Sequence, residues 1–164
     1  MPDVDDFGEQ DWLPSLMLGK VMQTLVERHR HPLRQFRYEV LWKRKGGKSD
    51  GRPIWGTCQL LRGLARYYSR DDDDVPVDAV ITVSADHAAN FGITNYQLEA
   101  ILYHELQHLG TSTDDDGNLK LVTVGHEIEG FVNDVRVYGA WMPVHKRLQD
   151  AFEQMPLIPE GYIR

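Results

Sequence analysis

Cysteine is almost missing from this sequence: Cys58 is the one cysteine among 164 residues. A single thiol can form no disulfide bond within the chain, and it cannot supply a zinc site built from several cysteines. Long apolar runs are missing too, so the sequence predicts no transmembrane helix. The acidic first residues lack the basic and apolar regions of a secretory signal, and we therefore expect a cytoplasmic protein.

Positive charge is scarce as well. The chain has 18 lysines and arginines against 25 aspartates and glutamates, which gives a net charge of −7. This excess of negative charge disfavours binding of a nucleic-acid backbone across the whole surface. The basic stretch Lys-Arg-Lys-Gly-Gly-Lys at residues 43–48 is interpreted as a solvated hairpin turn, and local contact with a nucleic acid is the alternative.

The length of the chain fits one domain with a hydrophobic core of its own. We assign this domain to residues 11–155, with a flexible N-terminus at 1–10 and a C-terminal tail at 156–164. The expected elements follow one another as a helix, three strands and then further helices, without βαβ repetition. This order predicts an α+β fold with a small three-to-four-stranded antiparallel or mixed sheet.

Hydrophobic periodicity places the expected elements along the chain. A first helix covers residues 12–30, with Pro14 in its first turn. Residues 36–43 and 53–61 alternate as an antiparallel strand pair, and the apolar run at 77–84 is typical of a strand buried on both faces. Elsewhere we expect a helical turn or a bent strand at 62–70, a helix at 94–109, a polar loop at 110–118, a short strand at 119–124, and helices at 126–139 and 143–154.

The sequence His-Glu-Leu-Gln-His at residues 104–108 is the strongest functional signal. On a helix, His104 and His108 lie about 40° apart on one face, so both imidazoles can reach a single ion. Glu105 is turned about 100° from His104, where its carboxylate can lean over an open coordination position. Two neutral nitrogen ligands beside a carboxylate base are the arrangement of a zinc hydrolase.

The residues around this motif favour a helix. Thr94 and Gln97 have the spacing of a capping box, and Gly110 offers a left-handed exit. An apolar stripe is formed by Leu98, Leu102, Leu106 and Leu109. His104 and His108 fall at the edge of this stripe. The alternative to a metal site is therefore a pair of histidines at the edge of the core, hydrogen-bonded to the backbone.

A catalytic zinc usually has three protein ligands and a water, so the histidine pair needs a third partner. We prefer His126, because Gly125 brings the backbone close and the histidine begins the next expected helix, from which its ring can point back. Glu129 is the alternative. The remaining candidates are Glu127, Asp134 and His145, of which His145 is expected at the surface, whereas His87 is expected to be structural or to line a groove.

Taken together, these motifs resemble those of the phage metallopeptidases related to SprT-like zinc metalloproteases, over about residues 36–150. The resemblance rests on the aromatic strand pair, on the buried strand that leads to Asp86, and on the motif at 104–108. It continues through Gly-His-Glu-Ile-Glu-Gly-Phe at 125–131 and Val-Tyr-Gly-Ala-Trp at 137–141. If a phage encodes the chain, the expected location is the host cytoplasm.

The family pattern looks like H-E-L-x-H followed by G-H-D-x-E-E-F. The resemblance implies that Zn²⁺ is bound by His104, His108 and His126, with Glu105 as the general base. The chain departs from the pattern at two positions, where Glu127 replaces an aspartate and Gly130 replaces an acidic residue. The cysteines found near the histidines in many relatives are absent, and no particular substrate is implied.

The sequence therefore predicts a zinc metalloendopeptidase that acts on a protein or peptide, with Glu105 taking the proton of a metal-activated water. An extended peptide could add to a sheet edge beside the motif helix. Two alternatives stay open. One is a zinc hydrolase that acts on peptidoglycan peptides, and the other is a non-catalytic binding or regulatory protein that zinc stabilises. The oligomeric state is not set by any sequence feature.

Overall fold

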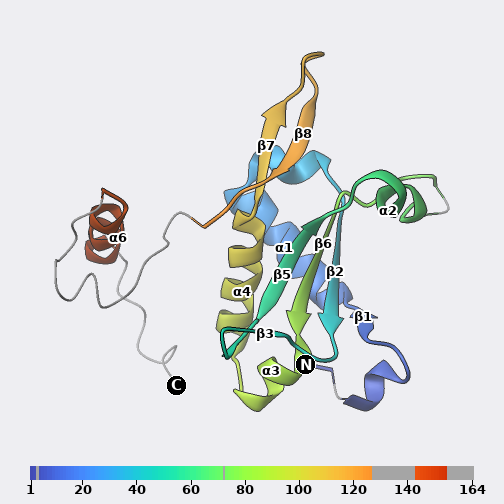
Figure 1. The fold of residues 1–164 in the computed structure, drawn as a ribbon, viewed down its shortest axis with the longest axis vertical. Helices are drawn as coiled ribbons and strands as arrows, with labels where there is room; N and C mark the ends of the chain where they lie inside the picture. Colours follow the sequence, from blue (N-terminus) through green and yellow to red (C-terminus); the bar gives the residue numbers. More distant parts are fainter. Residues whose placement is uncertain (3, 72, 127–142, 155–164) are drawn as a thin grey trace. The chain divides into compact units, whose positions relative to one another are not determined.

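The computed structural model describes residues 1–2, 4–71, 73–126 and 143–154 (Figure 1). Two compact units divide the chain, Met1–Val124 and Gly125–Arg164. Within the first unit the helical elements are η1 (Val4–Phe7), α1 (Leu16–His29), η2 (His31–Gln35), α2 (Gly63–Tyr68), α3 (Ala85–Asn90) and α4 (Asn95–Gln107). Its strands are β1 (Trp12–Pro14), β2 (Tyr38–Lys43), β3 (Lys48–Ser49), β4 (Arg52–Pro53), β5 (Gly56–Leu60), β6 (Ala79–Ser84), β7 (Leu109–Thr113) and β8 (Leu119–Thr123). The predicted α+β class is confirmed.

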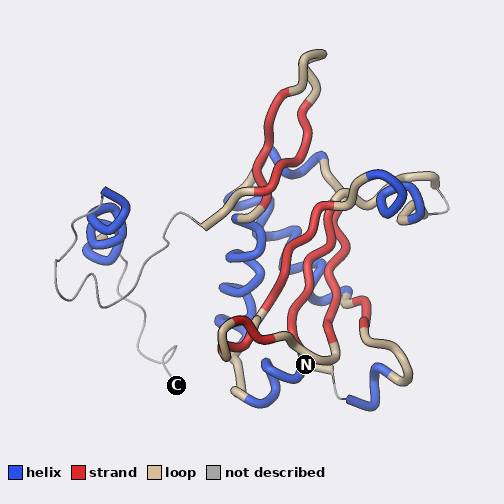
Figure 2. Tube along the Cα trace, viewed as in Figure 1, coloured by secondary structure: helices blue, strands red, loops and turns tan. Residues whose placement is uncertain are grey.

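The main sheet has four strands in the order β1-β2-β6-β5 (Figure 2). Strands β2 and β6 are parallel, whereas β1 pairs with β2 and β5 pairs with β6 in antiparallel fashion. The predicted pairing of residues 36–43 with 53–61 is therefore wrong, because β6 lies between the two strands. The physical reason is the sequence of β6, Ala-Val-Ile-Thr-Val-Ser, which is apolar enough to be buried in the middle of the sheet.

The hydrophobic core lies between one face of this sheet and helices α1 and α4, which also pack against each other (Figure 1). Alternate strand residues point to that face. The strands contribute Val40, Trp42, Ala79, Ile81 and Val83, and the helices contribute Leu18, Met22, Leu25, Val26, Leu98, Leu102 and Leu106. The opposite face is more polar, and the Thr57 and Thr82 hydroxyls are hydrogen-bonded across it at 2.7 Å.

The N-terminal part of the chain differs from its prediction at two places. Residues 12–14 form strand β1 rather than the start of a helix, and α1 begins at Leu16. The Ser15 side chain sets this start, because its hydroxyl accepts a hydrogen bond from Leu18 N. Before it, η1 lies in the segment expected to be loosely attached, yet the Phe7 side chain is buried in the core.

The ambiguous segment at 62–70 contains helix α2. Of the expected polar loop at 110–118, residues 110–113 belong to strand β7 and residues 114–118 form the turn that joins it to β8. Gly110 is therefore a strand residue paired with Val122, not the left-handed exit of a helix. In the second unit, helix α6 spans Pro143–Glu153, which confirms the predicted last helix. The helix expected from residue 126 to 139 lies outside the described residues, apart from His126. None of the described helices is long and apolar enough to span a membrane.

Candidate metal centre

Helix α4 carries the histidine motif, and its start is fixed by the predicted capping box. The Thr94 hydroxyl accepts a hydrogen bond from Gln97 N at 3.2 Å, and the Gln97 side chain accepts one from Thr94 N at 2.8 Å. Both bonds satisfy backbone donors that a helix N-terminus otherwise leaves open. The fully buried Leu102 and Leu106 hold the helix on the sheet. The motif is thus carried by a rigid, well-anchored element.

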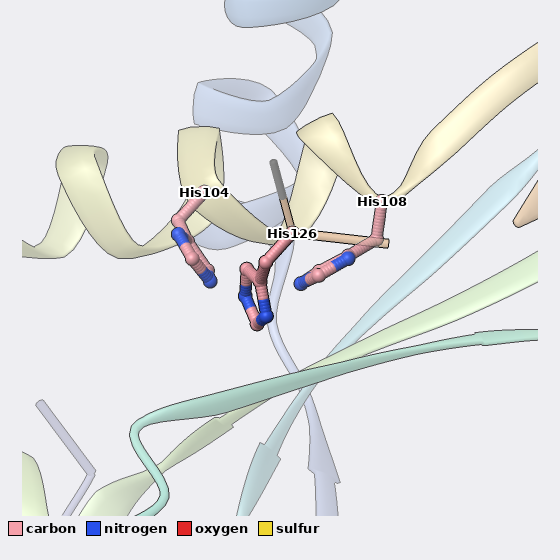
Figure 3. A group of neighbouring side chains, drawn as sticks. All are labelled: His104, His108 and His126. Atoms are coloured by element: carbon pink, nitrogen blue, oxygen red, sulfur yellow. The ribbon is translucent and has the colours of Figure 1, made fainter. Parts of the chain in front are cut away.

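Three histidines converge at the end of this helix. Potential ligand nitrogens of His104, His108 and His126 all lie within 4.8 Å of one another, and Figure 3 shows the three rings directed at a common space. Within the described residues this is the one group of three or more histidine, cysteine, aspartate or glutamate side chains that could hold a metal ion. Imidazole nitrogens are the donors that zinc and its neighbours in the transition series accept.

The third histidine is brought to the cluster by the β7–β8 hairpin. Strand β8 ends at Thr123, and the next residue returns to the end of α4. There Val124 N donates a hydrogen bond to the His108 carbonyl oxygen at 2.8 Å. Two residues further on, His126 is within ligand distance of the helical pair. The structure thus brings His126 beside His104 and His108, and its role as the third metal ligand stays a prediction.

The His108 ring has a defined tautomer in this arrangement. Its Nδ1 lies 2.8 Å from the Val124 carbonyl oxygen. A carbonyl oxygen only accepts, so Nδ1 carries the hydrogen and Nε2 of the neutral ring keeps its lone pair for a cation. Such an acceptor behind a ligating histidine both orients the ring and raises its basicity. The donor set therefore fits a metal ion.

Glu105 is buried, with 6% of its surface exposed, while His104 is exposed and His108 half-buried. It lies three residues after Leu102 on the side of α4 that faces the sheet, and this explains its burial. Loss of hydration raises the pKa of the Glu105 carboxyl, and the nearby His108 opposes this rise. The site thus combines a buried carboxyl group of raised proton affinity with three accessible imidazoles.

The other candidate residues lie elsewhere or outside the described residues. His87 is buried at the start of α3, where its Nδ1 lies 3.0 Å from the Ile54 carbonyl oxygen, and this agrees with the structural role expected for it. His145 is buried, with 6% of its surface exposed, so its predicted surface position is wrong. The residues that follow His145 in the sequence are mostly polar, so the local pattern did not predict that its ring is buried. Three further candidates, Glu127, Glu129 and Asp134, fall in the undescribed range 127–142.

Two contributors to the site were missed in the sequence. The Val124 carbonyl has no side-chain signature, and only the correct prediction of the β7–β8 hairpin would have revealed it. Gly56, on β5, leaves the space that Glu105 fills, since a Cβ atom there would lie 2.8 Å from Glu105 Cγ. A glycine inside an alternating strand is a recognised sign of close approach by another group, so this signal was present.

A helical histidine pair, a third histidine within reach and a buried carboxyl group beside them form the side-chain set of a metal-dependent hydrolase. Comparison with known families agrees with this class. A family model described as "Putative phage metallopeptidase" matches residues 10–154. The chain belongs to this family, which confirms the resemblance seen in its motifs. No curated protein and no solved structure matches it.

Proposed function

We propose that the protein is a zinc-dependent metallopeptidase in which His104, His108 and His126 bind the ion and Glu105 is the general base. The observation that carries this proposal is that ligand nitrogens of His104, His108 and His126 lie within 4.8 Å of one another, at the end of a helix that also carries the buried Glu105 carboxyl group. A protein that used the ion only to hold its fold together would have no need of that carboxyl group.

When bound, zinc acts as a Lewis acid that polarises a carbonyl group and makes a water molecule acidic. The protein supplies the rest of the chemistry. Glu105 accepts a proton from the attacking water at its carboxylate oxygen and delivers it to the leaving amine. Its burial suits both transfers, because a raised pKa brings the carboxyl closer to the pH at which it must release the proton again.

Strand β5 supports a peptide as the substrate. It is the terminal strand of the main sheet, and no strand in the described part of the chain pairs with its outer edge. Helix α4 packs against β5, and in the antiparallel pair of β5 with β6 only alternate residues of β5 direct their backbone N–H and C=O groups at β6. An extended peptide can bind such an edge through main-chain hydrogen bonds, independently of its sequence.

The test is cleavage of unfolded protein and of a peptide library by the zinc-loaded chain, followed by mass spectrometry of the products. The matched control is Glu105→Gln, which is nearly isosteric but cannot accept the proton. We expect the wild type to cleave and Glu105→Gln to lose about 10²–10⁴-fold in rate, with the zinc content and the fold retained. The inactive variant also provides a trap that should retain substrates in a pull-down.

Three other outcomes would contradict the proposal. Wild-type turnover by Glu105→Gln would remove the assigned base. Cleavage confined to purified peptidoglycan would identify a cell-wall hydrolase. A fully zinc-loaded wild type that cleaves neither protein, peptide nor peptidoglycan would identify a non-catalytic binding protein.

A further inference from the structure

Strand β5 turns one row of its residues towards helix α4. In the antiparallel register, Gly56 is opposite Val83 and Cys58 is opposite Ile81. Opposed residues of an antiparallel pair point to the same face of a sheet. Because Val83 and Ile81 are core residues under the helices, Gly56 also faces α4. It is the first residue of β5 and the smallest residue on this face.

The Glu105 side chain occupies the space that a residue larger than glycine would need at position 56. A Cβ atom on Gly56 would lie 2.8 Å from both Cγ and Oε1 of Glu105 and 3.0 Å from its Cδ. These separations are shorter than real carbon contacts. The clash involves Cγ as well as the terminal oxygen, so a small rotation of the carboxyl group alone cannot relieve it. The side chain as a whole would have to change its rotamer.

Glu105 has little freedom to move by any other route. Its backbone belongs to α4, and the fully buried Leu102 and Leu106 on either side hold that helix against the sheet. Its own side chain is 6% exposed, so it is enclosed rather than extended into solvent. The direction of the carboxyl group therefore depends on the space left free on β5.

We propose that Gly56 is a positioning residue for Glu105. Because position 56 has no side chain, the Glu105 carboxyl group can occupy the space on β5 from which it acts as the general base. The inference rests on the proposed function of Glu105 as the general base. It follows from the geometry that Gly56→Ala displaces the carboxylate while leaving the three histidines in place. A displacement of about 1 Å in a catalytic group can lower a rate by about 10²-fold.

The first test uses the stability of the metal-free chain and needs no substrate. Melting temperatures are measured for wild type, Gly56→Ala, Glu105→Ala and the double variant. Overpacking by one methyl group should lower the melting temperature of Gly56→Ala by roughly 2–10 °C. In the Glu105→Ala background the same substitution should cost less than half as much, because the clashing group has been removed.

Gly46→Ala is the matched control for this cycle. A Cβ atom on Gly46 would also be too close to its neighbours, the His87 ring and, at 2.8 Å, Ser84 Oγ, but Glu105 is not among them. Gly46→Ala should lower the melting temperature by the same amount in the wild-type and the Glu105→Ala background. An additive cycle for Gly56→Ala, like that of the control, would overturn the inference whatever the activity measurements show.

The second test is kinetic and uses the zinc-loaded chain. Gly56→Ala should lower kcat by about 10–100-fold with KM and zinc content little changed, and it should cost nothing further when added to Glu105→Gln. Unchanged kcat, or a rise in KM alone, would overturn the positioning role. If the wild type cleaves peptides but the stability cycle is additive, the proposed function is supported and the positioning role of Gly56 is wrong. If the cycle is coupled but the wild type cleaves nothing, the proposed function is wrong. The contact between Gly56 and Glu105 then has a structural role and no catalytic one.

Discussion

His108 and Val124 are joined by two hydrogen bonds, one between their backbones and one through the imidazole. Val124 N donates to the His108 carbonyl oxygen at 2.8 Å, and His108 Nδ1 lies 2.8 Å from the Val124 carbonyl oxygen. Val124 thus contacts the residue that caps α4 and orients the imidazole of that residue, which is a candidate ligand. These two bonds also fix the start of the segment that leads to His126. Contacts within the protein therefore orient the His108 ring and bring the chain before His126 to the end of α4.

Gly110→Ala tests the importance of this connection. A Cβ atom at Gly110 would lie 2.7 Å from Val124 Cγ2 and 3.2 Å from Val122 Cγ2, so the substitution pushes Val124 away from His108. Loss of an outer contact of this kind typically weakens metal affinity about 10–100-fold, and we expect a loss in that range from a zinc competition assay. Gly47→Ala, whose Cβ would meet Ile54 Cδ1 at an ordinary 3.4 Å, is the control. Equal zinc affinities in the two variants would contradict the prediction.

The identity of the third ligand is decided by metal content. We expect about one zinc per chain, with most of it lost from His126→Ala and all of it kept by Glu129→Ala. The exposed His31→Ala controls for the loss of an unrelated histidine. If Glu129→Ala loses the zinc while His126→Ala keeps it, the site belongs to the class with a glutamate ligand.

Chelation should lower the melting temperature. The three imidazoles are assembled only in the folded chain, so zinc binds the folded state in preference to the unfolded one. At a zinc concentration 100 times the dissociation constant the stabilisation is about 2.7 kcal/mol, or roughly 5–10 °C for a chain of this size. The measurement is a thermal melt with and without excess chelator. An unchanged midpoint after proven zinc removal would show that the fold does not use the ion.

The stability of the metal-free protein should depend on pH through Glu105. Burial raises the pKa of this carboxyl above 4.5, so the folded state holds the proton more tightly than the unfolded state. The stabilisation by the protonated group is complete at low pH and is lost as pH rises through the raised pKa. At neutral pH, Glu105→Gln should therefore melt at a higher temperature than wild type in chelator. The difference should shrink as pH is lowered towards 4.5. A difference that grows on acidification would contradict this account.

Cys58 should react slowly in the native protein. Burial, and secondarily the charge of Glu105, raises the pKa of the Cys58 thiol from 9.0 to about 12. At a given pH near neutrality the reactive thiolate is then roughly a thousandfold rarer than in the unfolded chain. Alkylation by iodoacetamide, followed by mass spectrometry, should be slow for the folded chain and fast in urea. Similar rates in both states would show that the thiol is not protected.

The parts of the fold that could be predicted from the sequence are those whose signals are local. The capping box at Thr94 and Gln97 fixes the start of α4, and both of its hydrogen bonds are present. The apolar run that forms β6 predicted a strand buried on both faces, and five of the six residues of β6 are buried. His126 was preferred as a partner for the helical pair from a glycine and its spacing, and it lies in the cluster.

The parts that could not be predicted depend on which distant segments meet. The alternation of residues in β2 and β5 fits either a direct hairpin or an arrangement with a third strand between them. The apolar sequence of β6 favours burial in the middle of the sheet, and this decides for the second arrangement. Gly110 has the position of a helix exit, but its pairing with Val122 makes it a strand residue. The enclosure of Glu105 by β5 is likewise a contact between segments about 50 residues apart, which no local pattern reports.

The place of β6 in the sheet also orders the folding of the chain. Among the described strands β5 pairs only with β6, and β2 pairs with β6 in parallel. Both β2 and β5 therefore depend on a strand that follows them in the sequence. Such nonlocal pairings raise contact order and slow folding. Until they form, α4 has no surface against which to bury Glu105. We therefore expect the histidine cluster to assemble late in folding, after β6 has joined the sheet.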